Sequence, residues 1–276
     1  MGLAIFFPVL IAGSSFLERN VWGIGGNLGK HFIFIYMWCV AGSSVVARLI
    51  MRESPRDISF RWAGWATTRA VLIATAMPLA VGLISYGIGW TAGLAHFATI
   101  GIPQVVYGIP ISGPPAMRFC KYLLISLTIG GLWSCRSAVG EEIGWRGYML
   151  TRLRDSGLPA PIFFSGLIWG LWHMPLILGG KYTSIPNSLL SIALFIADIT
   201  ALGYVLAWLR MSSGSIWPCI WAHSVWNELI LGPFDAATNN GSIWVGEAGV
   251  LTTLVVIPFV VAVYQLWPLP PKALKS

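Results

Sequence analysis

The stretch GEEIGWRGYML, residues 140–150, places two adjacent glutamates and an arginine in a chain of which only 10% is charged. Glu142 and Arg146 are four residues apart, so on a helix their side chains meet as an ion pair, and neutralisation of a buried charge is the simplest role for this pair. Glu141 lies about 100° from Glu142 around such a helix. Its carboxylate therefore faces another partner, which makes it a candidate general base.

Histidine is the second residue type here that can transfer protons, and it occurs in two suggestive settings. In WGLWHMPL, His173 follows Trp169 by one helical turn. In WAHSVWNEL, His223 and Asn227 are four residues apart and project from one helix face, where two side chains can meet a single ligand or oxyanion. The simpler interpretations are a hydrogen-bonded core histidine for His173 and an interhelical packing contact for His223 and Asn227.

The segments that carry these residues have the composition of membrane helices. Hydrophobic residues make up 56% of the 276 residues, and the mean hydropathy is +0.74. Several apolar runs approach the roughly 20 residues that a spanning helix needs, and the alternating pattern of an outer-membrane barrel is absent. The sequence therefore predicts an all-α fold, a polytopic transmembrane helix bundle of about eight spans. The predicted spans are 3–17, 32–50, 70–92, 119–139, 161–180, 187–209, 214–232 and 243–267.

Basic residues predict the orientation of these spans. Five arginines between Arg48 and Arg69 mark a cytoplasmic connection, because short cytoplasmic loops collect Lys and Arg. Eleven basic residues then fall on the cytoplasmic side, together with both termini, and five fall on the other side. Those five are Arg19, Lys30, Arg118, Lys121 and Lys181. The net charge of +7 is thus a topology signal, and no nucleic-acid partner is predicted.

No repeat or linker divides the chain, so residues 1–276 are predicted to form a single integral membrane domain with a motif-bearing core at about 119–232. Four cysteines without a CxxC pair indicate neither a disulfide framework nor a cysteine zinc site. Three other intramembrane acids have expected roles outside the chemistry. Asp198 hydrogen-bonds to the polar groups singled out above or pairs with a neighbouring helix. Glu228 faces a loop, and Glu247 reaches the membrane interface.

Three of the predicted spans can bring the polar groups together in one pocket. Glu141 lies at the cytoplasmic end of the fourth span, His173 within the fifth, and His223 with Asn227 midway along the seventh. A carboxylate and an imidazole can activate water there, while a second imidazole and an amide stabilise the oxyanion of a tetrahedral intermediate. Such a combination is suited to peptide hydrolysis.

At these residues the sequence resembles the CaaX protease and bacteriocin-processing family (CPBP, or Abi), whose relatives include type II CaaX prenyl endopeptidases. EEIGWRG is similar to the family's EExxxR motif. Trp169 to His173 resembles its motif of an aromatic residue, three residues and His, with Trp where Phe is commoner. His223 to Asn227 matches HxxxN. The resemblance covers about 88 residues, 140–227.

The resemblance implies an eight-helix intramembrane endopeptidase of the glutamate type. Glu141 and His173 would activate water, His223 and Asn227 would stabilise the oxyanion, and the supporting pair would be Glu142 and Arg146. The implied substrate is a membrane-associated peptide or protein, with or without a lipid. We expect the cytoplasmic membrane of a prokaryote, with the active site near its cytoplasmic side.

Alternative functions stay open at the level of sequence. Glu141, His173 and His223 also form a His₂Glu set that would suffice for a catalytic zinc ion. We favour a reaction without a cofactor, because Asn227 suits an oxyanion better than a metal and the HExxH zinc signature is absent. A non-catalytic membrane protein, such as a bacteriocin-immunity factor, could bind a peptide in the same pocket. A transporter or proton relay is the third class, although repeat symmetry is lacking.

Overall fold

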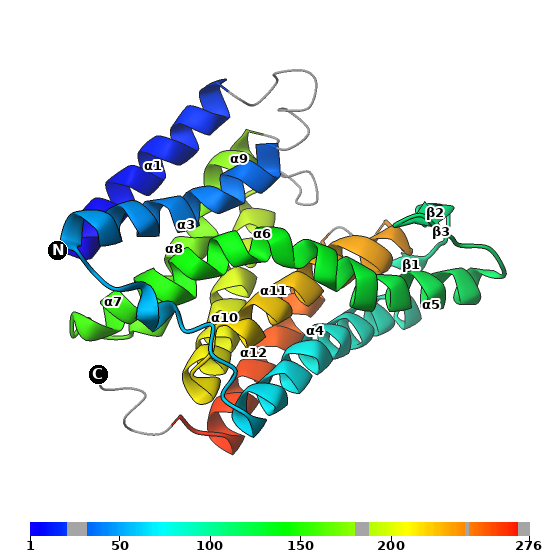
Figure 1. Ribbon diagram of the computed structural model, residues 1–276. Helices are drawn as coiled ribbons and strands as arrows, with labels where there is room; N and C mark the ends of the chain where they lie inside the picture. Colours follow the sequence, from blue (N-terminus) through cyan, green and yellow to red (C-terminus); the bar gives the residue numbers. More distant parts are fainter. Residues whose placement is uncertain (21–31, 180–187, 241–242, 270–276) are drawn as a thin grey trace.

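A computed structural model describes residues 1–20, 32–179, 188–240 and 243–269, and this part of the chain is mostly helical (Figure 1). Six of its helices are long and apolar enough to cross a membrane. They are Gly2–Asn20, Phe32–Met51, Trp65–Thr91, Pro115–Asp155, Pro161–Leu178 and Leu189–Ser213. The predicted all-α membrane bundle is confirmed. Four residues of the charge count, Lys30, Lys181, Lys272 and Lys275, lie outside the described residues.

The first half of the chain contains α1 (Gly2–Asn20), α3 (Phe32–Met51), the 3₁₀ turn η1 (Pro55–Ile58), α4 (Trp65–Thr91), β1 (His96–Phe97), β2 (Val105–Val106), β3 (Ile109–Pro110), α5 (Pro115–Ile125), the π turn η2 (Ser126–Gly130) and α6 (Gly131–Gly144). The second half contains the π turn η3 (Trp145–Met149), α7 (Leu150–Asp155), α8 (Pro161–Trp172), α9 (Met174–Leu178), α10 (Leu189–Ser213), α11 (Trp217–Leu229), the π turn η4 (Ile230–Phe234), β4 (Thr238–Asn239) and α12 (Val250–Leu266).

The last two predicted spans are shorter than expected. Helix α11 has 13 residues and α12 has 17, where spans at 214–232 and 243–267 were predicted. Beyond α11 the chain enters η4, in which Gly232 has non-helical dihedral angles and is followed by Pro233. Proline cannot donate a backbone hydrogen bond, so the regular helix cannot continue through this point.

The helix that carries the glutamates is longer than predicted. A span was expected at 119–139, whereas α5, η2, α6, η3 and α7 form one helical run over Pro115–Asp155. Two π turns interrupt it, and η3 begins only three residues after Glu142. Such turns inside α-helices occur frequently at functional sites.

Two small antiparallel pairings join short strands in the described residues. β1 pairs with β4, and β2 pairs with β3 in a hairpin beside α5 (Figure 1). Tyr107 and Gly108 close this hairpin with positive φ angles of 49° and 80°, as a two-residue loop of the I′ type requires. Each strand has only two residues, too few for a recognisable alternation of polar and apolar positions.

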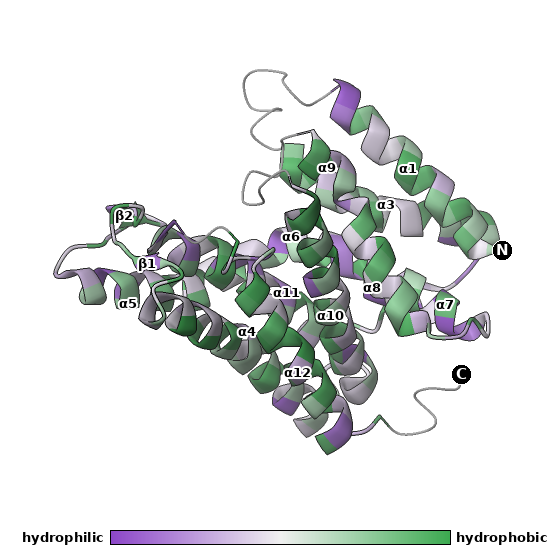
Figure 2. Cartoon of the chain, turned by 180° about the vertical axis from the view of Figure 1, so that it is seen from behind, coloured by the Kyte–Doolittle hydropathy of each residue, from purple (hydrophilic) through white to green (hydrophobic). Residues whose placement is uncertain are grey.

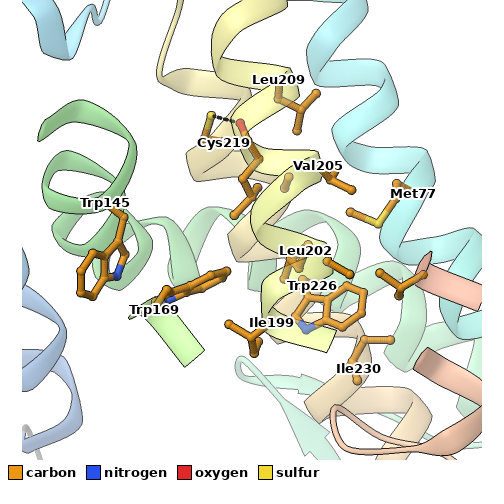
Figure 3. Packing of buried hydrophobic residues seen from close by; sticks show 14 of the residues in the cluster. Met77, Trp145, Trp169, Ile199, Leu202, Val205, Leu209, Cys219, Trp226 and Ile230 are labelled. Carbon is orange, nitrogen blue, oxygen red and sulfur yellow. Dashed lines mark hydrogen bonds between the residues drawn. The ribbon is translucent and has the colours of Figure 1, made fainter. Parts of the chain in front are cut away.

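Helix α10 lies at the centre of the apolar core. Its residues Leu202, Val205 and Leu209 are fully buried, together with Trp226 of α11 (Figure 3). Apolar residues predominate along α4, α10 and α12 (Figure 2). Several of them on α4 and α12 are exposed, among them Leu72, Leu83, Leu254 and Ile257. A helix that is apolar on its inner and outer faces is typical of a bundle surrounded by lipid.

Glycine permits two close helix contacts near the polar residues, one between α6 and α3 and one between α10 and α8. A methyl group at Gly144 of α6 would lie 2.6 Å from the carbonyl oxygen of Val40 in α3. One at Gly203 of α10 would lie 2.8 Å from Cα of Gly166 in α8. Only residues without a side chain allow backbones to approach this closely. These contacts fix α6 and α8, from which the polar groups below project.

Candidate active site

Three helical segments position the polar residues singled out above. Helix α6 and η3 carry the EExxxR residues, α11 carries the HxxxN residues, and His173 joins α8 to α9. Helix α6 packs directly against α11, and η3 contacts α8. Five of the six side chains are almost fully buried, and the sixth is half-buried. The exposed fractions are Glu141 2%, Glu142 0%, Arg146 1%, His173 5% and His223 3%, with Asn227 half-buried.

Glu142 is the link between two of these helices. Its Oε1 accepts hydrogen bonds from Arg146 Nη1, at 2.9 Å, and from His223 Nδ1, at 2.8 Å. The ion pair with Arg146 is the one that their spacing predicted. The bond to His223 was not predicted, and it fixes the ring, because an ionised carboxylate only accepts and Nδ1 must then carry the proton.

Glu141 is held through one of its two oxygens. Oε2 accepts hydrogen bonds from the indole nitrogens of Trp145, at 3.2 Å, and Trp169, at 2.8 Å. Oε1 faces His223 Nε2 at 3.7 Å, which is longer than a hydrogen bond. The two indoles thus orient the carboxylate so that Oε1 and His223 Nε2 border the same space.

Trp169 contacts both Glu141 and Arg146, the ion-pair partner of Glu142. Its ring lies 4.2 Å from the Arg146 guanidinium, in cation–π geometry, while its indole nitrogen donates to Glu141. The roles of the two tryptophans were missed in the sequence. For Trp145 a signal existed, because it follows Glu141 by four residues, the same spacing as Glu142 and Arg146.

His173 lies beside this group with its ring oriented by the backbone. Its Nδ1 is 2.9 Å from the carbonyl oxygen of Trp169, so Nδ1 is the donor and, in the neutral ring, Nε2 is the basic nitrogen. The rings of Trp172 and Phe195 pack edge-on against it. His173 is close enough to Glu141 and His223 for an electrostatic interaction with both.

Asn227 follows His223 by one turn of α11. Its side chain makes no hydrogen bond to any residue that the structure describes, and it is half-buried where the other five groups are buried. The structure thus places it on the helix face expected from the sequence without joining it to the network. Its amide is available to a ligand.

The other intramembrane acids lie apart from this group. Asp198 of α10 is fully buried near Glu247. Glu247 is only 3% exposed and accepts a hydrogen bond from Trp226 Nε1 at 2.8 Å, so the expectation that it reaches the interface was wrong. Glu228 accepts a hydrogen bond from the hydroxyl of Tyr107 in the hairpin loop, at 2.8 Å, which agrees with the expected loop-facing role.

The alternative of a zinc site can be compared with this geometry. Within the described ranges, no group of three or more His, Cys, Asp or Glu side chains is arranged to hold a metal ion. One oxygen of Glu141 is engaged by two indole donors, and His223 Nδ1 is engaged by Glu142. These bonds leave Glu141 Oε1 and His223 Nε2 without a hydrogen bond among the described residues, and such bonds also occur behind zinc ligands. A zinc ion is disfavoured because Glu141, His173 and His223 are not arranged as a three-residue ligand group where the structure describes them.

The region that carries the candidate site is similar to a known protein family. Residues 120–229, which include all six site residues, match the family described as "Type II CAAX prenyl endopeptidase Rce1-like". A curated relative, "CAAX prenyl protease 2" of Methanococcus maripaludis, is 36% identical over 82 residues, which is 28% of this chain and 30% of the relative. The chain thus spans under a third of that relative's length in the match. The resemblance is confirmed over residues 120–229, where the sequence is similar to this family.

Proposed function

We propose that this chain is an intramembrane endopeptidase that hydrolyses a peptide bond in a membrane-associated substrate. The observation that carries the proposal is the buried arrangement of Glu141 Oε1 opposite His223 Nε2, at 3.7 Å, with each side chain held from behind by other groups. The family match over residues 120–229 supports the reaction class. We further propose that residues 1–276 act as one membrane domain whose catalytic core is about 119–232.

Glu141 and His173 activate the water in this proposal. Oε1 of Glu141 accepts a proton from water while the water oxygen bonds to the carbonyl carbon of the substrate. His173 Nε2 accepts the second hydrogen bond of the same water and orients it. When the C–N bond breaks, Glu141 returns its proton to the leaving amine, so the carboxylate is regenerated.

His223 stabilises the oxyanion, and Glu142 determines how it does so. Nδ1 donates to Glu142, so Nε2 can donate only if the ring is an imidazolium. An imidazolium between Glu141 and Glu142 has a carboxylate beside each nitrogen. The imidazolium offsets one of these two carboxylate charges, and Arg146, which pairs with Glu142, offsets the other. This charge distribution suits a donor to developing negative charge.

Asn227 supplies the second donor to the oxyanion. Its amide has no competing partner in the described part of the chain and lies on the same face of α11 as His223. The site is closed to solvent, because Glu141, His173 and His223 are at most 5% exposed. A peptide therefore reaches these groups only when side chains or helices around them move.

The substrate class follows from the surroundings. A site buried among membrane helices suits a peptide that is anchored at the membrane by an apolar segment or a lipid. We propose that it enters from the cytoplasmic side of a prokaryotic inner membrane and that both termini lie on that side, as the distribution of arginines favours. No nucleic-acid partner is proposed.

The test compares two variants that each neutralise a buried, indole-bonded carboxylate. Glu141→Gln should lower kcat for a quenched-fluorescence lipidated peptide by about 10²-fold or more, because a general base is lost. Glu247→Gln, whose carboxylate accepts from Trp226 outside the site, is the matched control and should keep kcat within severalfold. Full activity of folded Glu141→Gln protein would refute the proposal. Peptide binding without cleavage by the wild type would favour the non-catalytic alternative.

The same assay distinguishes a zinc-dependent reaction from one without a metal. Elemental analysis of the purified protein and cleavage with and without a chelator are measured together. We expect kcat to be unchanged by the chelator, since the side chains do not form a ready ligand set. Activity that is lost on chelation and restored by zinc would instead assign Glu141, His173 and His223 as ligands.

A further inference from the structure

A cavity of about 300 Å³ lies away from the catalytic residues, between η1, α7 and the C-terminal end of α10. Its lining includes Arg152 and Arg154 of α7 and Arg210 in the last turn of α10. Three arginines around one small cavity constitute an unusual concentration of charge in a chain with 10% charged residues. We refer to it as the arginine pocket.

Two carboxylates, Asp57 and Asp155, also line the arginine pocket. They and Glu53 pair with Arg152 and Arg154 and leave Arg210 without an ion pair in the described part of the chain. Arg152 pairs with Glu53, at 2.7 Å, and with Asp57, at 3.0 Å. Arg154 lies 3.5 Å from Asp155. Arg210 makes no ion pair within the described residues, and its Nη2 donates only to the backbone oxygen of Asp57, at 2.6 Å.

Arg210 is therefore the arginine of this pocket that is available to bind an anion. Its Nε is buried and makes no hydrogen bond among the described residues, and its charge interacts unfavourably with that of Arg154. Asp57 offsets part of this cost through its charge, but its carboxylate makes no ion pair with Arg210, and a guanidinium with little solvent and no directly paired carboxylate is costly. An anion in the arginine pocket would remove both costs, because guanidinium groups bind the oxygens of phosphate in pairs.

The surroundings place the arginine pocket at the surface of the membrane. Ser59 of its lining donates to the carbonyl oxygen of Gly214, which ties the chain after η1 to the end of α10. Large aromatic side chains follow directly and are exposed. They are Phe60, 44%, Trp62, 55%, Trp65, 71%, and Trp217, 39%. Exposed aromatic residues beside arginines are typical of the level of lipid headgroups.

We infer that the arginine pocket binds the phosphate group of an anionic phospholipid headgroup. Basic pockets between membrane helices have the charge and depth that such headgroups require. The apolar side chains of Leu150 and Met211, which also line the cavity, suit the glycerol end of the lipid. Because α7 continues the helix that carries Glu141, the lipid also holds the end of the catalytic helix.

The experiment measures lipid retention by delipidated full-length protein in detergent, using native mass spectrometry. The protein is titrated with phosphatidylglycerol and, separately, with the neutral lipid phosphatidylcholine. Inorganic phosphate is added as a competitor, which distinguishes a lipid site from a site for a soluble anion. Arg210→Gln removes the unpaired guanidinium. Arg52→Gln is the matched control, because it removes one exposed arginine near the same end without lining the cavity.

We expect wild-type protein and Arg52→Gln to retain phosphatidylglycerol about tenfold more tightly than phosphatidylcholine, and Arg210→Gln to lose most of this preference. Arg154→Gln should give the same loss if Arg210→Gln fails to fold. Equal retention of the two lipids by wild type would overturn the inference, and so would equal losses in Arg52→Gln and Arg210→Gln. Binding of inorganic phosphate without any lipid preference would identify a soluble-anion site and overturn the assignment to a lipid.

Discussion

His223 Nδ1 lies 2.8 Å from Glu142 Oε1, although 81 residues separate them in the sequence. The same oxygen accepts from Arg146, so one atom connects α11 to the helix that carries both glutamates. Glu142 thereby does more than neutralise Arg146. It determines the proton position on the His223 ring, and with it the nitrogen that faces Glu141.

Replacement of Glu142 by Gln should affect catalysis and stability together. The amide cannot hold the imidazolium, so kcat should fall by about 10²-fold. Arg146 is only 1% exposed and would become a buried charge without a counter-charge, which costs about 3–5 kcal/mol. Peptide cleavage and thermal unfolding in detergent measure the two effects.

The control for this substitution is Glu53→Gln. Glu53 also pairs with an arginine, Arg152, at 2.7 Å, but both side chains are more than 20% exposed. Its removal should cost less than about 1 kcal/mol and leave kcat unchanged. A Glu142→Gln protein as active as Glu53→Gln would show that His223 does not need this carboxylate.

The indole donors to Glu141 give a second prediction. Trp145→Phe and Trp169→Phe each remove one hydrogen bond to Oε2 while keeping an aromatic ring. A hydrogen bond to a charged group contributes about 1.5–3 kcal/mol, and we expect each variant to lower kcat by roughly 10-fold, with a larger loss in the double variant. The measurement is kcat and KM for the lipidated peptide.

Trp172→Phe is the matched control for the tryptophan variants. Its indole nitrogen donates to Ser14 Oγ, at 3.1 Å, and not to an acid of the site. It should therefore keep kcat near the wild-type value. A loss in Trp172→Phe as large as that in Trp169→Phe would mean that bulk packing, and not orientation of Glu141, determines the rate.

Much of the fold follows from the sequence because hydropathy and helix length are local properties. The six long helices fall on predicted spans, and the Glu142–Arg146 pair follows from spacing on one helix. The π turns at Ser126–Gly130 and Trp145–Met149 do not follow, since no residue pattern marks where a helix widens. The two-residue strands are too short to carry a pattern.

The sequence singles out the residues of the candidate site but not the contacts between them. Spacing indicates that His223 and Asn227 share a face, yet it cannot indicate which oxygen of which glutamate the His223 ring meets. That depends on the relative rotation of α6 and α11, which tertiary packing fixes. The same reason explains Glu247, which reads as interfacial in the sequence but accepts from the buried Trp226.

Asp235 gives a prediction about pH. It lies just beyond η4, where burial raises the pKa of its carboxyl from the usual 3.8 to about 6, although the Tyr86 hydroxyl donates to it. The folded state then keeps a proton that the unfolded state loses, so the free energy of unfolding falls as pH rises from about 4 to 6, by on the order of 3 kcal/mol. Above about pH 6 this contribution is constant.

The measurement is the apparent Tm of wild type and Asp235→Asn between pH 4 and pH 7.5. Asparagine has no proton to lose, so the difference in Tm between the two proteins should change over the interval from pH 4 to 6 and then level off. A difference that does not vary with pH would show that Asp235 titrates alike in both states.

The contact of α6 with α3 gives the last prediction. A methyl group at Gly144 would lie 2.6 Å from the backbone oxygen of Val40, and a backbone atom cannot rotate away as a side chain can. Gly144→Ala should therefore lower stability by about 1–3 kcal/mol and shift the helix that carries Glu141, so that kcat falls too.

Gly87→Ala is the matched control, because Gly87 lies inside α4 with no atom within 4 Å of the added methyl group. In that position alanine should raise stability by roughly 0.5–1 kcal/mol, since it restricts the unfolded chain without a clash. Thermal unfolding in detergent distinguishes the two. If Gly144→Ala is as stable and as active as Gly87→Ala, close approach of α3 is not what positions the helix that carries Glu141.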